Sequence, residues 1–414
     1  MPLAIMPIHP DAPSLRMTIA ARLSQAPESS ISDLNRLTYF RGRVALAAIL
    51  RGLGVKRGDE VIIQAFTCIA VPEAILSLGA IPRYADVAAG SPNMDPDDLR
   101  RKIGPRTRAI VIQHTFGLPA DVSRLAAVAG AMDVPIVEDC AHTIASRVDG
   151  RRVGSFGAAA FYSYEASKPV FIGIGGSAVT NDAALSAVLM RDYERRYVQP
   201  SRLVQLQLDA MRLAHRVTYR PSTYWTVRAV FRAVVATGMI RGNYNKVAAV
   251  AAPGGSESSA GHVTGSPDFT LRMGNRQSVL LRGELADIDR QSAHRRWVAE
   301  QYRARINAED VAHLPLPAGA EPVFGRYPLL ANDRPELLAR ARNAKVELAD
   351  FYSTPVHPLK GDALRDVAYE PGSCPRAEWI ADRIVSLPTG MQVNDGQLRR
   401  AVNCLNAYSM ESSA

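Results

Sequence analysis

The sequence predicts an α/β fold: a large domain with a mostly parallel sheet flanked by helices, and a smaller C-terminal α+β domain. Two observations predict it. Between about residues 44 and 139, short apolar runs typical of buried strands alternate with runs typical of helices, the pattern of strands joined by right-handed crossovers. In addition, the 414 residues suffice for about two domains of ordinary size.

The alternating elements can be placed one by one. Strands are predicted in DEVIIQAF (59–66), AIPRYADV (80–87), RAIVIQ (108–113) and VPIVED (134–139). Helices are predicted in VALAAILRGL (44–53), VPEAILSLG (71–79), DPDDLRRKI (95–103) and DVSRLAAVAGAM (121–132). Parallel sheets bind ligands beyond the carboxyl ends of their strands. Asp139, at the end of the fourth strand, therefore marks the expected position of a site.

Composition changes along the chain predict its division into domains. We expect a poorly patterned N-terminal arm (1–35), a large domain (36–290) and a small C-terminal domain (291–414). A helical insertion is predicted within the large domain at about 190–265, and it ends in the Gly/Ser/Pro-rich loop APGGSESSAGHVTGSPDF. The following run, RQSVLLRGELADIDRQSAHRRWVAEQYRARI, predicts one long helix or two.

Composition and charge narrow the classes of function. A content of 47% hydrophobic and 21% charged residues is typical of a globular protein. The formal charge of +9 is dispersed along the chain, which argues against a nucleic-acid partner and fits anionic small molecules or an acidic surface. The four cysteines have neither metal-type nor disulfide spacing, so we expect no metal site and a reducing, cytoplasmic location. No signal peptide or membrane-spanning run is evident.

Lys168 is the first candidate for catalysis. It lies between two strand-like runs in FYSYEASKPVFIGIGGSAV, beside closely spaced glycines. A lysine held in a tight, partly dry site loses proton affinity and becomes nucleophilic toward carbonyls. The alternative is a surface lysine after a turn. Ser163, five residues earlier, offers a hydroxyl either to a phosphate or to the backbone at a strand end.

Two further features are compatible with a bound cofactor. Asp139 could hold a protonated ring nitrogen, as pyridoxal phosphate requires for its ring to act as an electron sink. Gly42 lies just before a helix in YFRGRVAL, where backbone N–H groups can approach an anion, and Arg43 adds positive charge. The alternatives are a helix cap or ion pair for Asp139 and an ordinary turn at Gly42.

Other cofactor and catalytic motifs do not fit the sequence. GIGIGGSAV is not a G-x-G-x-x-G fingerprint, and no G-x-x-x-x-G-K-[ST] or G-x-S-x-G run occurs. The histidines His114, His142 and His357 are scattered, which makes a metal site an unfavoured interpretation. The features at Lys168, Asp139 and Gly42 therefore stay the candidates that the residues themselves offer, each with its alternative open.

Several longer segments carry a resemblance to a known family. GDEVIIQAFTCIAVPEAILSLGAIPRYADV resembles a strand–helix–strand opening, and VEDCAH resembles the segment EDAAQ. RRVGSFGAAAFYSYEASKP…GGSAVTND resembles GRRVGSFGDAACFSFHPTKN…GGAVVTND, while LRMGNRQSVLLRGEL and VSLPTG match more loosely. From about Tyr39 to Tyr408 the chain thus resembles the DegT/StrS-type sugar aminotransferases, which have the type I fold of pyridoxal-phosphate enzymes.

The resemblance implies roles at the cofactor ring. Lys168 would link covalently to pyridoxal phosphate and shuttle a proton, and Asp139 would pair with the pyridinium nitrogen. His142 stands where the family commonly has a glutamine near the phenolic oxygen of the cofactor. Thr67 and Cys68 lie where the family packs a residue against the ring face.

The resemblance also implies how the phosphate would be held. Ser163 and the backbone of Gly42, Arg43 and Val44 would form the phosphate site. The neighbouring subunit of a homodimer usually completes it, from the segment around Thr270 and Arg272. The active unit implied by the resemblance is therefore at least a dimer.

Four residues depart from the family pattern. Cys68 replaces a frequent aromatic residue, Glu165 a frequent histidine, Arg43 a frequent threonine, and Thr270 a common asparagine. The lysine and the aspartate are retained, so the departures bear more on the sugar than on the cofactor.

The function implied is pyridoxal-phosphate-dependent transfer of an amino group, from L-glutamate, to a keto-sugar that is nucleotide-linked. Two alternatives remain open at this point. One is a sugar dehydratase on the same fold, against which Lys168 argues because that branch usually has a histidine at the lysine position. The other is a non-catalytic, cofactor-binding regulatory protein.

The segment from Ser201 to Met239 looks longer than the family's usual connection. Leu203, Leu206, Ala210, Leu213 and Val217 recur at helical spacing, and a second apolar set follows Pro221. Arginines dominate its charges, so one interpretation is a basic amphipathic hairpin lying on an anionic membrane face. The alternative is a hairpin packed on its own subunit or on the dimer partner.

Overall fold

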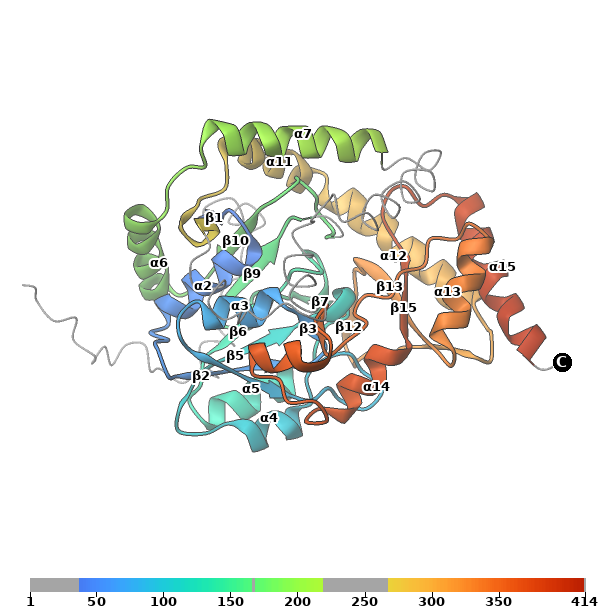
Figure 1. The fold of residues 1–414 in the computed structure, drawn as a ribbon, viewed down its shortest axis with the longest axis horizontal. Coiled ribbons are helices and arrows are strands. Elements are labelled where there is room, and N and C mark those ends of the chain that lie inside the picture. The colour runs from blue at the N-terminus through green and yellow to red at the C-terminus, as the bar shows by residue number, and fades with distance from the viewer. Residues whose placement is uncertain (1–36, 166–167, 219–266, 413–414) are drawn as a thin grey trace, which may run out of the picture.

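The computed structural model describes residues 37–165, 168–218 and 267–412 (Figure 1). Its centre is a seven-stranded sheet whose spatial order is β1 (Leu37–Tyr39), β10 (Gly176–Val179), β9 (Ala159–Ser163), β6 (Ile136–Asp139), β5 (Thr107–Gln113), β2 (Glu60–Gln64) and β4 (Ile81–Ala85). The five strands from β9 to β4 run parallel to one another. Strand β10 pairs antiparallel with β9 on one side and with β1 on the other. The predicted α/β fold with a mostly parallel sheet is confirmed.

Helices cover both faces of this sheet. Their bounds in the large domain are α2 (Gly42–Gly52), α3 (Ala70–Leu76), α4 (Pro96–Lys102), α5 (Val122–Ala131) and α6 (Ala183–Arg196). Three of them begin at an aspartate whose carboxylate accepts backbone N–H groups of the first turn: Asp95, Asp121 and Asp182. These caps explain why the helices predicted from residues 95 and 121 start where they do.

Alternation along β2 divides the core between the two faces. Val61 and Ile63 pack in the same cluster as the buried residues of α2 and α3. Ile62, between them, packs in a second cluster with residues of α4 and α5. A strand buried on both faces has an unbroken apolar run rather than an alternating one, which is what VIIQAF provides.

The C-terminal part forms a small α+β unit. The predicted long helix is two helices, α11 (Asn275–Ala286) and α12 (Ile288–Arg305). Beyond them an antiparallel sheet has the order β11 (Val311–His313), β13 (Arg326–Ala331) and β15 (Ile384–Pro388). The helices around it are α13 (Arg334–Asn343), α14 (Pro375–Arg383) and α15 (Asp395–Ser412).

Short 3-10 turns occur in both parts of the described chain: η3 (Thr115–Gly117), η4 (Pro267–Thr270) and η5 (Gly361–Val367).

Two small sheets tie this unit to the large domain. In one, β14 (Val356–His357) pairs in parallel with β3 (Thr67–Cys68). In the other, β12 (Ala320–Glu321) pairs with β7 (Arg147–Val148), which pairs with β8 (Arg151–Arg152). The first pairing places a loop of the small unit over the carboxyl end of the central sheet, where a site was predicted.

Helix α7 (Arg202–Thr218) begins the predicted insertion and lies on the outside of the molecule (Figure 1). Val204 and Leu208 pack on an apolar cluster formed by Phe40, Ile174 and Leu271. Leu203 and Leu206, the first two residues of the predicted stripe, are 65% and 66% exposed. Where its side chains are described, the helix therefore packs on its own chain through Val204 and Leu208 and not through these two residues.

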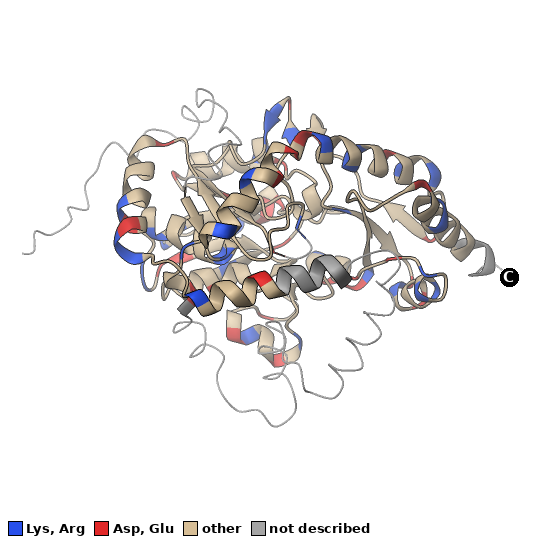
Figure 2. Ribbon diagram, turned by 90° about the horizontal axis from the view of Figure 1, so that it is seen from above, with Lys and Arg blue, Asp and Glu red and all other residues tan. Residues whose placement is uncertain are grey.

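Three sequence predictions lie wholly or partly outside the described residues. They are the N-terminal arm (1–35), the second half of the basic hairpin (219–239) and the rest of the predicted helical insertion with most of its Gly/Ser/Pro-rich loop (240–266). In the part of the chain that is described, no helix is long and apolar enough to cross a membrane. Lys and Arg are scattered among Asp and Glu over the helices, as the sequence predicted (Figure 2).

Candidate active site

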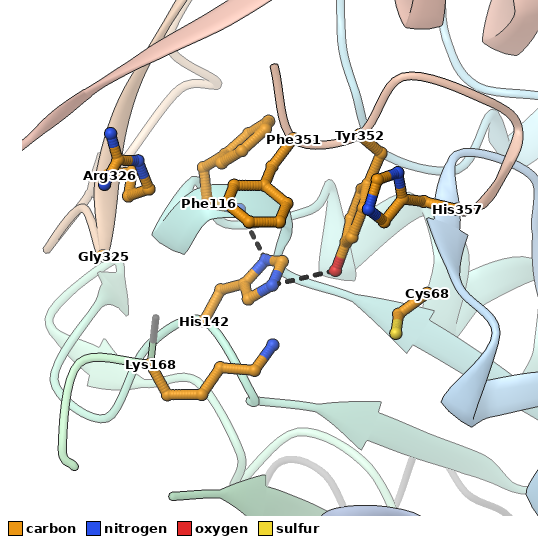
Figure 3. Close-up of a pocket in the computed structure, with 9 residues that line it drawn as sticks. All are labelled: Cys68, Phe116, His142, Lys168, Gly325, Arg326, Phe351, Tyr352 and His357. Atoms are coloured by element: carbon orange, nitrogen blue, oxygen red, sulfur yellow. Dashed lines mark hydrogen bonds between the residues drawn. The ribbon is translucent and has the colours of Figure 1, made fainter. Parts of the chain in front are cut away.

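A pocket opens between the large domain and the small unit at the end of the sheet (Figure 3). The large domain contributes one wall, made by Cys68, Phe116, His142 and Lys168. The small unit contributes the opposite wall, made by Gly325, Arg326, Phe351, Tyr352 and His357. In Figure 3 the amine of Lys168 faces the ring of His142.

Lys168 lies in the connection between β9 and β10, which we call the lysine loop. Its backbone N–H donates to the carbonyl of Glu165 at 3.2 Å. Its positive charge bears on three groups around it, since it opposes the rise in pKa of Asp139 and of Cys68 and adds to the fall in pKa of His142. Four predicted site residues, Lys168, Asp139, Cys68 and His142, therefore lie close enough together for the charge of Lys168 to affect the other three.

Asp139 ends β6 and is 5% exposed. Burial raises the pKa of its carboxyl, while the N–H of Ala141, which donates to Oδ1 at 2.9 Å, and the charges of Lys168 and His114 act in the opposite direction. A buried carboxylate is stabilised most by a hydrogen-bonded cation. Asp139 therefore has the properties required to hold a protonated ring nitrogen.

The start of α2 is packed directly on the end of β9. A Cβ added to Gly42 would lie 2.9 Å from Cβ of Ser163, and one added to Gly176 would lie 2.5 Å from the backbone N of Gly42. The helix has Arg41 as its N-cap without a side-chain cap hydrogen bond, and no acidic residue in its first turn. The N–H groups of Gly42 and Arg43 are thus suited to an anion, whereas the N–H of Val44 donates to the carbonyl of Arg41 at 3.1 Å.

Two ion pairs lie beside this helix terminus. Arg43 pairs with Glu73, which is 8% exposed and whose pKa is raised by burial. Arg41 contacts Glu165 at 3.1 Å and Asp268 at 2.7 Å. The unusual Arg43 and Glu165 noted in the sequence are therefore each matched by an opposite charge, and Arg41 connects the lysine loop to η4.

His142 is held by hydrogen bonds at both ring nitrogens (Figure 3). The N–H of Phe116 donates to Nδ1 at 3.0 Å, so the neutral ring carries its proton on Nε2, which faces the hydroxyl of Tyr352 at 2.9 Å. Burial, and then the charge of Lys168, lowers the pKa of His142 well below its usual value. The ring is therefore a neutral hydrogen-bonding group beside the lysine.

Thr67 and Cys68 occupy the short strand β3. The hydroxyl of Thr67 donates to Oε1 of Gln113 at 2.8 Å, which fixes its direction at the sheet end. Cys68 lines the pocket, and burial raises the pKa of its thiol. A thiol at this position fills less of the pocket than an aromatic side chain would.

Thr270 ends η4, and Arg272 lies two residues beyond it. The guanidinium of Arg272 donates to the carbonyls of Tyr197 at 2.6 Å and Tyr193 at 3.1 Å, and it lies over the ring of Tyr193. Within this chain Arg272 is thus bound away from the Lys168 pocket. Its contribution to a neighbouring subunit stays a prediction.

Sequence reasoning did not assign Phe116, Phe351, Tyr352 or His357 to the site. Phe116 has a φ of 59°, in the left-handed region, which turns its ring toward His142 at a centroid distance of 5.9 Å. Burial lowers the pKa of His357 to about 4. Tyr352 meets His142 across 210 positions of sequence, and no local pattern signals such a contact.

One buried cluster has the side-chain types of a metal site: His114, Glu138 and Cys140. Glu138 already accepts N–H groups from Gly154, Phe156 and Gly157 at 2.6–2.7 Å, and His114 lies 3.1 Å from it. The second nitrogen of His114 accepts the N–H of Ala120. Because these atoms already have hydrogen-bond partners within the protein, we interpret the cluster as structural: it stabilises the chain next to Asp139.

Comparisons with known proteins identify the family and the fold of the chain. The sequence model of the DegT/DnrJ/EryC1/StrS aminotransferase family matches residues 34–196 and 243–406. A UDP-N-acetyl-3-dehydro-alpha-D-glucosamine 3-aminotransferase of Acidithiobacillus ferrooxidans is 29% identical, over 92% of this chain and 87% of its own. A dTDP-3-amino-3,4,6-trideoxy-alpha-D-glucose transaminase of Streptomyces venezuelae is 28% identical, over 89% and 81%.

Solved structures share the fold. The S. venezuelae protein DesV, in complex with a ketimine intermediate, superposes with a TM-score of 0.68 at 23% identity, over 96% of this chain and 94% of its own. The PLP form of the sugar aminotransferase Spr1654 of Streptococcus pneumoniae gives a TM-score of 0.68 at 18% identity, over 95% of each chain. From the two matched segments, which span most of its length, the chain belongs to the DegT/DnrJ/EryC1/StrS aminotransferase family.

Proposed function

We propose that the chain uses pyridoxal phosphate to transfer an amino group from L-glutamate to a nucleotide-linked keto-sugar. The observation that carries the proposal is that Lys168 lines the pocket while its charge bears on the buried Asp139 and on Cys68, which also feels the charge of Arg43 at the start of α2. The names of the relatives support the substrate class, since they include enzymes of UDP- and dTDP-linked sugars.

The residues present fit this cofactor at two separate points. Asp139 has a raised pKa because it is buried, and a ring N–H⁺ would give its carboxylate a hydrogen-bonded cation. At the other point, Ser163 adjoins the first turn of α2, where Gly42 leaves room that a Cβ would fill. We infer that Ser163 and the N–H groups of Gly42 and Arg43 bind the phosphate; the N–H of Val44, expected there from the sequence, donates to the carbonyl of Arg41 instead.

The protein residues would divide the work as follows. Pyridoxal phosphate, when bound, supplies an electron sink that stabilises negative charge on the carbon bearing the amine. Asp139 would hold the proton on the ring nitrogen, and Lys168 Nζ would take the proton from the α-carbon of the amino donor. His142, neutral and fixed by Phe116 and Tyr352, would place its ring beside the cofactor.

The small-unit wall suits a sugar. Phe351 and Tyr352 offer aromatic faces, and Tyr352 adds a hydroxyl close to His142. His357 is uncharged near pH 7 because burial lowers its pKa to about 4. We infer that the hexose lies against this wall, where flat apolar surfaces and hydroxyl partners meet.

We further propose a homodimer in which Thr270 and Arg272 approach the neighbour's phosphate site. Twofold dimers are the commonest closed oligomers, and α7 packs next to this segment through Val204 and Leu208, which leaves Leu203 and Leu206 exposed. Light scattering at assay concentration tests the assembly, and an active monomer would contradict it. All four cysteines are free, which supports the proposed reducing, cytoplasmic location.

The function is tested with the full chain, L-glutamate and a panel of UDP-, dTDP- and GDP-linked keto-hexoses, read by mass spectrometry. We expect one substrate class to gain a mass corresponding to amination, and Lys168→Ala to abolish it. Substrates that all remain unchanged with the cofactor-loaded chain would refute the proposal.

A further inference from the structure

Arg295, on α12, contacts three separate segments through one guanidinium. Nη2 donates to the carbonyl of Pro169 at 3.0 Å, and Nη1 donates to the carbonyl of Gly325 at 3.0 Å and to Oγ1 of Thr389 at 2.9 Å. These acceptors belong to the lysine loop, to the start of β13 and to the end of β15. All three are uncharged, and burial, followed by the charge of Arg326, lowers the pKa of Arg295 to about 10.

The junction that Arg295 holds is tightly packed. A Cβ added to Gly325 would lie 2.8 Å from the carbonyl oxygen of His142 and 3.3 Å from Cγ of Pro169. Thr389 donates in turn to the carbonyl of Phe324 at 2.6 Å. Gly325, just before β13, is therefore in close contact with Pro169 and with the backbone of His142. Arg295 joins these segments by its hydrogen bonds to the carbonyls of Gly325 and Pro169.

We propose that Arg295 is a positioning residue that fixes the Lys168 loop against the small-unit wall of the pocket. Its significance for Lys168 chemistry rests on the proposed function. The reasoning is geometric: Pro169 is bonded to Lys168, so holding its carbonyl limits where the lysine side chain can begin. Gly325 lines the pocket, so the same guanidinium fixes both walls.

The planar fork of arginine is essential to this arrangement. Its N–H groups diverge in fixed directions and can reach separated acceptors at once, whereas a lysine ammonium is a single point charge. Arg295→Lys therefore keeps the charge but loses the bridge. Arg295→Gln loses both, and the two variants together separate charge from geometry.

The test compares these variants with a control on the same helix. Arg303 donates from Nη2 to the carbonyl of Leu314 at 2.8 Å, away from the lysine loop, so Arg303→Gln removes a similar arginine–carbonyl contact. The first readout is hydrogen exchange of the cofactor-free chain in peptides covering 168–175. This segment includes the amides of Lys168 and Ile172, which donate to Glu165 and Tyr164.

We expect exchange in 168–175 to rise at least about tenfold in Arg295→Lys and Arg295→Gln, and to stay unchanged in Arg303→Gln. The second readout is the concentration of pyridoxal phosphate that half-saturates borohydride labelling of Lys168, which we expect to rise at least about tenfold in both Arg295 variants. A purely structural arginine would lower thermal stability and move neither readout.

Two results would overturn the proposal. One is wild-type exchange in 168–175 for Arg295→Lys. The other is an equal rise for Arg303→Gln, which would indicate general loosening. Failure of the wild-type chain to label at Lys168 would refute the proposed function instead, and the exchange comparison would still decide whether Arg295 places the loop.

Discussion

Gly42→Ala perturbs the proposed phosphate site with a single methyl group. The added Cβ would lie 2.9 Å from Cβ of Ser163, 3.2 Å from its Oγ and 3.3 Å from the carbonyl oxygen of Tyr162. Carbon atoms in contact prefer about 3.5–4.0 Å, so the start of α2 must move away from β9 by several tenths of an ångström. Overpacking of this kind costs about 1–3 kcal/mol.

The displacement acts where the phosphate would bind. If the helix moves to relieve the clash, its first N–H groups lose their distance and direction to the anion. A loss of about 1–3 kcal/mol corresponds to roughly 5- to 150-fold weaker binding of pyridoxal phosphate. Gly283→Ala on α11 is the control, because its Cβ would have nothing within 4 Å and should stabilise the helix by about 0.5–1 kcal/mol.

The assay is a cofactor titration followed by absorbance, with urea unfolding of the cofactor-free chain in parallel. We expect Gly42→Ala to lower both the affinity and the free energy of unfolding, and Gly283→Ala to leave the affinity unchanged. Wild-type affinity in Gly42→Ala would refute the assignment of the phosphate to the start of α2.

Three further predictions follow from the site and the surface. Asp139→Asn should keep the cofactor bound yet slow single-turnover transamination by roughly 10²-fold or more, and near-normal turnover would make Asp139 a structural cap. His357 has a pKa of about 4 against 6.5 unfolded, so stability should fall by up to about 3 kcal/mol as pH drops from 6.5 to 4, and His357→Asn should flatten that dependence in urea unfolding. The exposed stripe of α7 should bind anionic liposomes at low salt, and Leu203→Ser with Leu206→Ser should reduce the bound fraction; a wild-type protein left in the supernatant excludes membrane docking.

The sequence was most informative where local pattern decides structure. The run VPIVED is apolar and short, so it predicts a buried strand with Asp139 at its end, and β6 ends there. In the same way, the apolar run that follows Gly42 predicts a helix, and α2 begins at Gly42. Such placements depend only on neighbours in sequence, and the chain supplies them within a few residues.

Contacts between distant segments could not be predicted in this way. Tyr352 meets His142, and Arg295 meets Pro169, only because β14 pairs with β3 and α12 passes behind the lysine loop. Helix α7 shows a different limit. It is apolar on two sides, and sequence spacing alone does not tell which side meets Phe40 and Leu271.

The central claim is that Lys168 carries the cofactor, and borohydride reduction tests it most directly. The full chain is loaded with pyridoxal phosphate, reduced, digested and mapped by mass spectrometry. We predict a single stoichiometric label on the peptide containing Lys168, lost in Lys168→Ala without loss of the folded state. A label on another lysine, or no label at all, would contradict the account.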